Sequence, residues 1–342
     1  MMSRLPLLLC ALVYAAPALR AWDYDGHRIV NQLALVGLPP AFPTFVRTPA
    51  AAERIAFLAG EPDRWRNATE LPLRQANGLD HYLDLEQLEA AGLAPGTLSA
   101  LRYEFATQFA AGRAKHPENF PAIDPAKNSD HSREWPGFLP WAITEHYEKL
   151  KSAFSSLRTF QESGGTPEEI ANAQADVIYA MGVMGHYVGD STQPLHTTIH
   201  NNGWVGANPK GYTTWEGFHA WIDGGFNAKI GLTLADVATR ARAAKVLATA
   251  TAAGARDTLF GEIMDHLVAE NARVEPLYEL DKAKKLSGTL PASEEGRAFI
   301  EEQLLRGGEL LSSLWLTAWR TAQPDPYLRG QLIKRQVQAA AK

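Results

Sequence analysis

The chain of 342 residues contains a single cysteine, Cys10, which lies near its start. If the first 21 residues are removed, the remaining protein has no disulfide and no thiolate metal ligand. This excludes the small secreted folds that disulfides hold together. An exported protein without disulfides fits a bacterial periplasm or growth medium better than a eukaryotic secretory route. Any metal in the mature protein must be held by nitrogen and oxygen atoms.

Strand patterns and positive charge are also scarce. Alternating valine, isoleucine and threonine runs of strand length are rare, and no Asn-Gly or Asp-Gly pair joins two such runs. The formal net charge is −5, and loss of the two arginines in residues 1–21 takes it to −7. This acidic balance argues against a broad basic footprint for duplex DNA. A polyanionic substrate held mainly by metal ions stays open.

Residues 1–21 have the pattern of a secretory signal peptide. Arg4 precedes an apolar run from Leu5 to Leu19, and Ala21 is suitable to precede a cleavage site. The run is too short, and too interrupted by proline, to cross a bilayer as a helix. We expect cleavage after Ala21 and a secreted or periplasmic protein. The mature chain would begin at Trp22, whose free α-amino group and carbonyl oxygen could chelate a metal.

Helical periodicity dominates the rest of the chain, so the sequence predicts an all-α protein with one domain over residues 22–325. Pro117–Pro136 and Thr197–Thr214 are rich in proline, asparagine and glycine and are predicted to be long loops at a functional rim. Residues 326–342 are predicted to be a basic C-terminal tail. The predicted helices are Gly26–Leu38, Pro49–Trp65, Thr97–Ala110, Pro140–Phe160, Pro167–Gly189, Trp215–Ile230, Thr233–Ala252, Ala255–Tyr278 and Ala292–Ala322.

Histidine and aspartate recur at the spacings of metal ligands. His186 and Asp190 are four residues apart, and so are His219 and Asp223. On a helix both members of such a pair point to one side. Imidazole and carboxylate are ligands that zinc prefers, and the set is too large for one tetrahedral ion but suits a cluster. The candidates are His27, Asp63, His81, His186, Asp190, His196, His219 and Asp223.

Five other histidines are left out of this set. A lone histidine on an apolar helix is more often a hydrogen-bonded core residue than a ligand. His200 is the nearest case, because it follows His196 by four residues, but it lies in a predicted loop. The five are His116, His131, His146, His200 and His266, and by the same reasoning Trp135, Phe138, Trp141 and Tyr147 are assigned to the core.

Two motifs resemble one family closely. They are Trp22-x₄-His27 and Gly185-His-Tyr-Val-Gly-Asp-Ser-Thr-Gln-Pro-Leu-His196. Both look like the zinc-dependent, single-strand-specific nucleases typified by mung bean nuclease. That family shares its fold with the bacterial trinuclear-zinc phospholipases C. The motifs run from Trp22 to about Asp223, and the resemblance continues as plain helices to about residue 322.

The resemblance implies three zinc ions held between helices. The first would be bound by Asp63, His81, His186 and Asp190, the second by Trp22, His27 and a bridging Asp190, and the third by His196, His219 and Asp223. Two zinc ions that share a carboxylate can activate a water for in-line attack on a phosphodiester. Asp63 would be the hydrogen-bond partner of that water. Arg66 matches the family's phosphate-binding arginine, although a surface arginine is the plain alternative.

The residues after His81 bear on the substrate. In the nucleases the positions of Tyr82 and Asp84 hold an aromatic that stacks on a base and an aspartate that binds the base's edge. Stacking of this kind tolerates any sequence and favours single strands. The resemblance therefore implies single-stranded DNA or RNA, or 3′-nucleotides, cleaved to 5′-mononucleotides. A helix cap is the plainer alternative for Asp84.

One stretch departs from the nuclease pattern. Asn201-Asn202-Gly203 and Gly217-Phe218-His219 stand where the nucleases usually carry Asp-x-Gly-Gly-Asn and Asn-Leu-His. Gly-Phe-His is closer to what the phospholipases show. A zinc-dependent phospholipase C that acts on phospholipid head groups is therefore the alternative. We expect no stable protein partner for either activity.

Overall fold

The computed structural model describes residues 22–249 and 257–341, so the predicted signal peptide lies outside the described residues. Within these ranges helices are joined by turns and loops, and an isolated bridge between Asn201 and Gly203 is the only β pairing. The predicted all-α fold in a single domain is confirmed. The helices are α1 (Tyr24–Gly37), α2 (Pro49–Leu58), α3 (Glu61–Arg66), α4 (Leu71–Gly78), α5 (Leu85–Ala90), α6 (Arg102–Lys115), α7 (Leu139–Glu162), α8 (Pro167–Ser191), α9 (Phe218–Ala220), α10 (Phe226–Ile230), α11 (Leu234–Val237), α12 (Thr258–Asn271), α13 (Val274–Lys282), α14 (Glu294–Thr321) and α15 (Pro326–Ala340).

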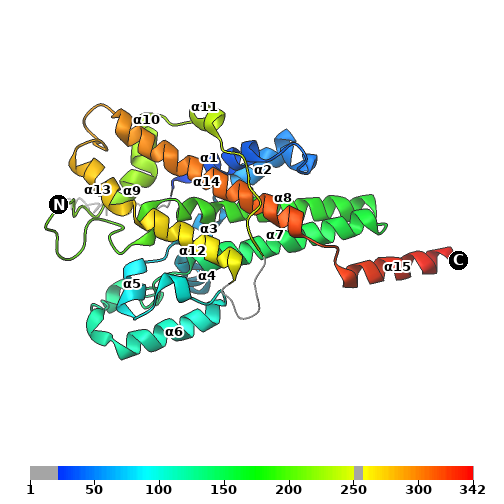
Figure 1. Ribbon diagram of the computed structural model, residues 1–342, viewed down its shortest axis with the longest axis horizontal. Helices are drawn as coiled ribbons and strands as arrows, with labels where there is room; N and C mark the ends of the chain where they lie inside the picture. The colour runs from blue at the N-terminus through cyan, green and yellow to red at the C-terminus, as the bar shows by residue number, and fades with distance from the viewer. Residues whose placement is uncertain (1–21, 250–256, 342) are drawn as a thin grey trace, which may run out of the picture.

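The core lies among the long helices α1, α7, α8 and α14. Figure 1 shows α7 and α8 side by side through the middle of the molecule, with α1 and α14 beside them. Burial of apolar side chains between such helices is the main stabilising term. The aromatic residues predicted to be core are confirmed as such: Phe138, Trp141 and Tyr147 are buried, and Trp135 is half-buried against them.

Helix α8 begins where its sequence says it should. The Thr166 side chain accepts from the Glu169 backbone N–H, and the Glu169 carboxylate accepts from the Thr166 N–H. This capping box satisfies donors that the first turn leaves open, and Pro167 fits there because it needs no hydrogen bond. From Ala180 to Ser191 every residue of α8 is buried. The helix therefore carries its C-terminal turns into the centre of the molecule.

The predicted helix Pro49–Trp65 is wrong as one element, because it is broken into α2 and α3. Pro62 stands in the first turn of α3 and cannot donate a backbone hydrogen bond to the preceding turn. Gly60 lies against Tyr24, and a Cβ there would come within 2.7 Å of the ring. The break leaves the Ala59 carbonyl available to a side chain from another helix.

Two later predictions are also wrong in part. Trp215–Ile230 does not begin as a helix until Phe218, and its middle is a π-helical turn over Trp221–Gly225. In the predicted helix Thr233–Ala252, α11 ends at Val237, residues 241–249 have no regular secondary structure, and residues 250–252 lie outside the described residues. Backbone N–H groups of the irregular segment donate to the Gly37 carbonyl of α1 and to the Ser313 and Thr317 hydroxyls of α14. Tertiary partners therefore replace the helical ones.

The remaining predicted helices differ mainly at their ends. The helix expected over Thr97–Ala110 begins at Arg102 and runs to Lys115. The one expected over Ala255–Tyr278 is divided into α12 and α13, and its first two positions lie outside the described residues. The two predicted loops are confirmed, since they contain no more than short 3₁₀ turns and the single bridge.

The segment expected to be a C-terminal tail is the helix α15. Figure 1 shows it extending away from the body of the molecule. Asp325 caps its first turn, and Arg335 pairs with Glu169 at 2.7 Å, which attaches the helix to the start of α8. No helix among the described residues has the length and apolar content needed to cross a membrane.

Candidate metal centre

The structure brings the predicted histidines and aspartates together in the middle of the molecule. Three groups form, and within each the possible ligand atoms lie within 4.8 Å of one another. Most of these side chains are buried, whereas Asp63 and His219 each keep about 15% of their side-chain surface exposed. These buried groups could bind metal ions. The three groups are His27, His186 and Asp190; Asp63, His81 and His186; and His196, His219 and Asp223.

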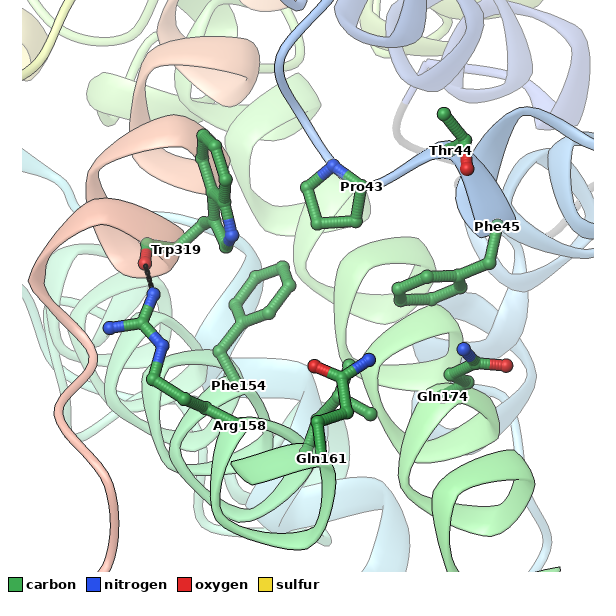
Figure 2. Close-up of a pocket in the computed structure, with 9 residues that line it drawn as sticks. Pro43, Thr44, Phe45, Phe154, Arg158, Gln161, Gln174 and Trp319 are labelled. Atoms are coloured by element: carbon green, nitrogen blue, oxygen red, sulfur yellow. Dashed lines mark hydrogen bonds between the residues drawn. The ribbon is translucent and has the colours of Figure 1, made fainter. Parts of the chain in front are cut away.

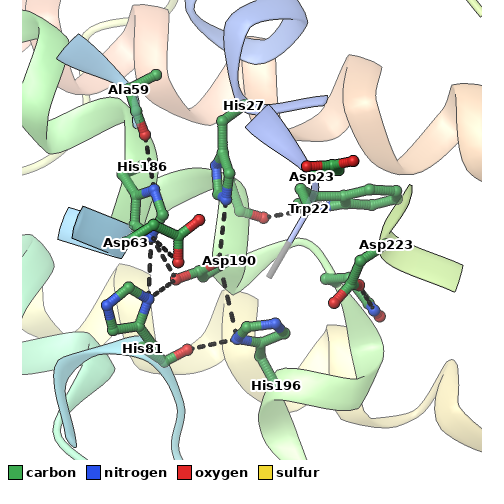
Figure 3. A network of polar contacts seen from close by, with 12 residues as sticks. Trp22, Asp23, His27, Ala59, Asp63, His81, His186, Asp190, His196 and Asp223 are labelled. Carbon is green, nitrogen blue, oxygen red and sulfur yellow. Dashed lines mark hydrogen bonds and ion pairs between the residues drawn. The ribbon is translucent and has the colours of Figure 1, made fainter. Parts of the chain in front are cut away.

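Asp190 faces two groups at once. Its Oδ2 lies 2.9 Å from His81 Nδ1 and 3.3 Å from His186 Nε2. Its Oδ1 points the other way and lies 3.4 Å from His27 Nε2 (Figure 3). A carboxylate whose two oxygens meet two separate sets of imidazoles is suited to bridge two metal ions. The structure thus brings His27, His81 and His186 around Asp190, the residue that the sequence predicted to be a shared ligand.

The predicted i,i+4 pairs lie on one side of their helices. His219 Nε2 is 2.9 Å from Asp223 Oδ2 and 3.0 Å from His196 Nε2. This third group depends on the π-helical turn over Trp221–Gly225, which contains Asp223. Such turns are rare and often occur at functional sites, because they move one side chain out of regular helical register.

Backbone carbonyls set the orientation of two of the rings. His186 Nδ1 donates to the Ala59 carbonyl at 2.7 Å, and His196 Nδ1 donates to the His81 carbonyl at 2.5 Å. In both rings Nε2 is then the nitrogen that points into the centre. A ligating histidine usually has its other N–H fixed in this way. The broken helix at Ala59 therefore has a role, because an intact helix would have used that carbonyl.

Two glycines of α8 allow the neighbouring helix α1 to approach. A Cβ at Gly189 would lie 2.6 Å from His27 Nδ1, and one at Gly185 would lie 1.6 Å from Asn31 Oδ1. Neither distance is compatible with a real side chain. The absence of side chains at these positions brings His27 within reach of Asp190. The buried Asn31 amide also donates to the Gly182 carbonyl at 3.0 Å and joins α1 to α8.

Several buried polar atoms in the centre have no hydrogen-bond partner among the described residues. They include His27 Nδ1 and Nε2, His81 Nε2 and Asp190 Oδ1. Buried polar atoms are rarely left unpaired, because each costs roughly 1–3 kcal/mol. Metal coordination would satisfy such atoms. A set of imidazoles and carboxylates without sulfur fits zinc, so the residues present suit the group that the sequence implied.

Electrostatics favour the ligating protonation states. Burial lowers the pKa of His27 and of His196, and with Arg66 it lowers the pKa of His81 to about 3. These imidazoles are neutral at physiological pH, as ligands must be. Burial opposes ionisation of Asp190, but His186 and His196 hold its pKa well below the usual range. His186 differs: burial opposes its protonation, yet Asp190 and Asp63 raise its pKa.

The predicted residues at the rim lie beside this centre. Arg66 Nε is 2.7 Å from Asp63 Oδ1, and both side chains are mostly buried. Tyr82 follows the candidate ligand His81 directly and is half-buried. Asp84 is the N-cap residue of α5, but its side chain makes no capping hydrogen bond. Its Oδ2 accepts from Gln87 at 2.7 Å, its Oδ1 has no hydrogen-bond partner among the described residues, and burial raises its pKa to about 7.

Trp22 lies against the same centre. Its side chain is fully buried, and the indole Nε1 donates to the Gly189 carbonyl at 3.0 Å. Figure 3 shows it beside His27. Two buried residues that support the centre, Asn31 and Gln193, were not predicted from the sequence. The latter donates to Asp223 Oδ1 at 2.5 Å. Asn31 had a usable signal, because it lies one helical turn after His27.

The five histidines left out of the set lie outside the three groups found among the described residues. His146, for example, is half-buried with its ring 4.9 Å from the Tyr187 ring, and burial lowers its pKa to about 3. A separate pocket of about 270 Å³ is lined by residues 43–45 and by side chains of α7, α8 and α14, and it contains none of the candidate metal ligands (Figure 2). Phe154 and Trp319 line it, and no histidine or acidic residue does. It has no metal-binding character.

No known family, curated protein or solved structure matches the chain.

Proposed function

We propose that the protein is a zinc-dependent phosphodiester hydrolase that holds three zinc ions. The observation that carries the proposal is the position of Asp190, whose two oxygens face two sets of imidazoles. Asp63, His81, His186 and Asp190 would hold one ion, and His196, His219 and Asp223 another. His27 and Asp190 would hold the remaining ion, together with the amino group and carbonyl of Trp22. The last assignment requires cleavage before Trp22, which we propose for a secreted or periplasmic protein.

Bound zinc would supply Lewis acidity, lowering the pKa of water and neutralising phosphate charge. Asp63 would accept a hydrogen bond from the water that attacks the phosphate, a role supported by the 15% of its side chain that is exposed. Burial raises its pKa, but His186 and Arg66 more than offset this, so the carboxylate stays ionised. Arg66, held by Asp63, would bind a non-bridging phosphate oxygen and spread the negative charge of the transition state.

The substrate we propose is single-stranded DNA or RNA, with 3′-nucleotides as smaller substrates. The support is Asp84, a buried carboxyl group with one oxygen that lacks a hydrogen-bond partner, two residues after Tyr82. The amino edge of a base could donate to that oxygen while Tyr82 stacks on its face. The competing proposal is a phospholipase C. It is favoured by Gly217-Phe218-His219, the approach to the third group that is closer to the phospholipases.

The test compares Tyr82→Ala with Arg66→Ala on two substrates. Loss of stacking worth roughly 1–3 kcal/mol should lower kcat/KM on single-stranded DNA about ten- to a hundredfold for Tyr82→Ala. The same variant should leave hydrolysis of bis-p-nitrophenyl phosphate nearly unchanged, because that ester has no base. Arg66→Ala should lower turnover on both substrates. Equal losses for Tyr82→Ala on both, or wild-type activity confined to phosphatidylcholine, would favour the phospholipase instead.

A further inference from the structure

The segment that follows α8 is buried although it is not a regular helix. Thr192, Gln193 and Thr197 have no exposed surface, and His196 has 2%. A buried irregular segment must find partners for its backbone carbonyls, because water cannot reach them. This segment carries His196 from the end of α8 to the third group, so whatever holds its backbone also determines where His196 lies.

Side chains from two other helices hold this backbone. Gln303 of α14 donates from Nε2 to the Thr192 carbonyl at 2.6 Å. Asn271, the last residue of α12, donates from Nδ2 to the Thr197 carbonyl at 2.9 Å and to its hydroxyl at 3.2 Å. The two amides thus hold the segment on either side of His196. None of the three groups of possible metal ligands contains either residue.

A buried carboxylate fixes one of these amides. Glu270 is fully buried, and its Oε2 accepts from Gln303 Nε2 at 2.5 Å while its Oε1 accepts from Arg306 Nε at 2.5 Å. Both hydrogens of the Gln303 amide are then used, one by Glu270 and one by Thr192, so the amide cannot rotate. A buried charge is costly unless it is paired, and Arg306 provides the pair. Packing alone would need only apolar side chains at these positions.

The His196 ring is otherwise held through Nδ1, which donates to the His81 carbonyl and lies 3.8 Å from Asp190 Oδ1. The His196 carbonyl accepts from the Leu83 N–H at 2.9 Å, and the ring Nε2 faces His219 Nε2 at 3.0 Å. A shift of the segment would turn the ring about its hydrogen bond to the His81 carbonyl. The Nε2 atoms of His196 and His219 could then no longer bind the same metal ion. Metal sites are sensitive to such outer contacts, whose loss typically weakens metal binding ten- to a hundredfold.

We propose that Asn271 and Gln303, with Glu270 behind them, are positioning residues that hold His196 for the metal of the third group. This inference rests on the metal assignment in the proposed function, but not on the substrate. It predicts an effect on one metal site from residues that do not touch a metal.

The test uses Asn271→Leu and Gln303→Met, which keep side-chain size but cannot donate to the carbonyls. Thr317→Val is the matched control. It removes a buried hydroxyl of α14 that accepts from the Leu247 N–H, not from the segment that carries His196. Zinc occupancy at each site is measured by anomalous diffraction, and affinity by competition with a chelator. Melting temperatures of the metal-free proteins report the cost to the fold.

We expect the third zinc to bind about ten- to a hundredfold more weakly in both variants, with the other two retained. Thr317→Val should keep all three zinc ions even if its metal-free protein melts lower. Unchanged affinity at the third group, or an equal loss at all three, would overturn the proposal. Wild-type protein without metal at the third group would overturn it together with the metal assignment. Three metals without activity on nucleic acid would count against the proposed substrate alone.

Discussion

The two halves of α8 differ in burial and in composition. The first half is solvated, with exposed residues such as Glu168, Asp176 and Tyr179, and it begins with a capping box. The second half, residues 180–191, is buried throughout and contains glycine, histidine and aspartate, which are poor helix formers. Local rules therefore stabilise the first half, whereas the second depends on neighbouring helices. One regular helix can therefore be stabilised by local interactions in one half and by tertiary packing in the other.

The largest difference between the halves should come from Asp190→Asn. The amide keeps the size of the side chain but removes the charge and one ligand oxygen, so the two proposed zinc sites that Asp190 would bridge should both lose metal. Activity should fall by more than about a hundredfold, because losing an outer partner alone costs up to that much. Asp176→Asn, on the exposed half of the same helix, should change neither. Elemental analysis that finds wild-type metal content in Asp190→Asn would contradict the bridging role.

Gly185→Ala tests the same contrast through the sign of the change in the free energy of unfolding. Helix propensity alone predicts stabilisation by about 1 kcal/mol when alanine replaces glycine. The new Cβ would lie 1.6 Å from Asn31 Oδ1, however, and overpacking costs typically about 1–3 kcal/mol. We expect net destabilisation in urea unfolding. Ala175→Gly on the exposed half should cost only the propensity difference. Stabilisation by Gly185→Ala would mean that α1 can move away without cost.

The sequence predicted the features that depend on local spacing. His186 and Asp190 are separated by one turn of α8, so their convergence follows from α-helix geometry, whereas His219 and Asp223 meet across a π-helical turn. The long helices follow from apolar periodicity, and the start of α8 follows from its cap. These predictions were correct because each depends on residues close together in the chain.

The features that failed depend on distant partners. Residues 241–249 have helix-forming composition but bond the hydroxyls of Ser313 and Thr317 on α14. The free carbonyl of Ala59 matters only because His186 lies opposite it. Gln303 resembles any other polar residue of a long helix until Thr192 is seen beside it. No local pattern contains such information, since the partner is far away in the chain.

Thr166→Ala should affect only the solvated half. Loss of the N-cap side chain typically costs about 1 kcal/mol, because the Glu169 N–H loses its acceptor. The free energy of unfolding should fall by that amount, while zinc content and activity stay at wild-type levels. Loss of metal in this variant would show that the two halves of α8 are coupled. The solvated and buried halves of α8 would then not be stabilised independently.

The smallest expected effect is a pH-dependent contact between the start of α8 and α15. The hydrogen bond from Arg335 lowers the pKa of Glu169 from 4.5 to about 2. Because the folded value is the lower one, the contact stabilises fully above pH 4.5 and is lost as the pH falls toward 2. Relative to its intrinsic rate at each pH, amide exchange in α15 should therefore accelerate over this range. Arg335→Gln should show fast exchange already near neutral pH, whereas Glu168→Gln should behave as wild type. If α15 exchanges equally slowly in Arg335→Gln, packing against α7 holds the helix and the ion pair contributes nothing.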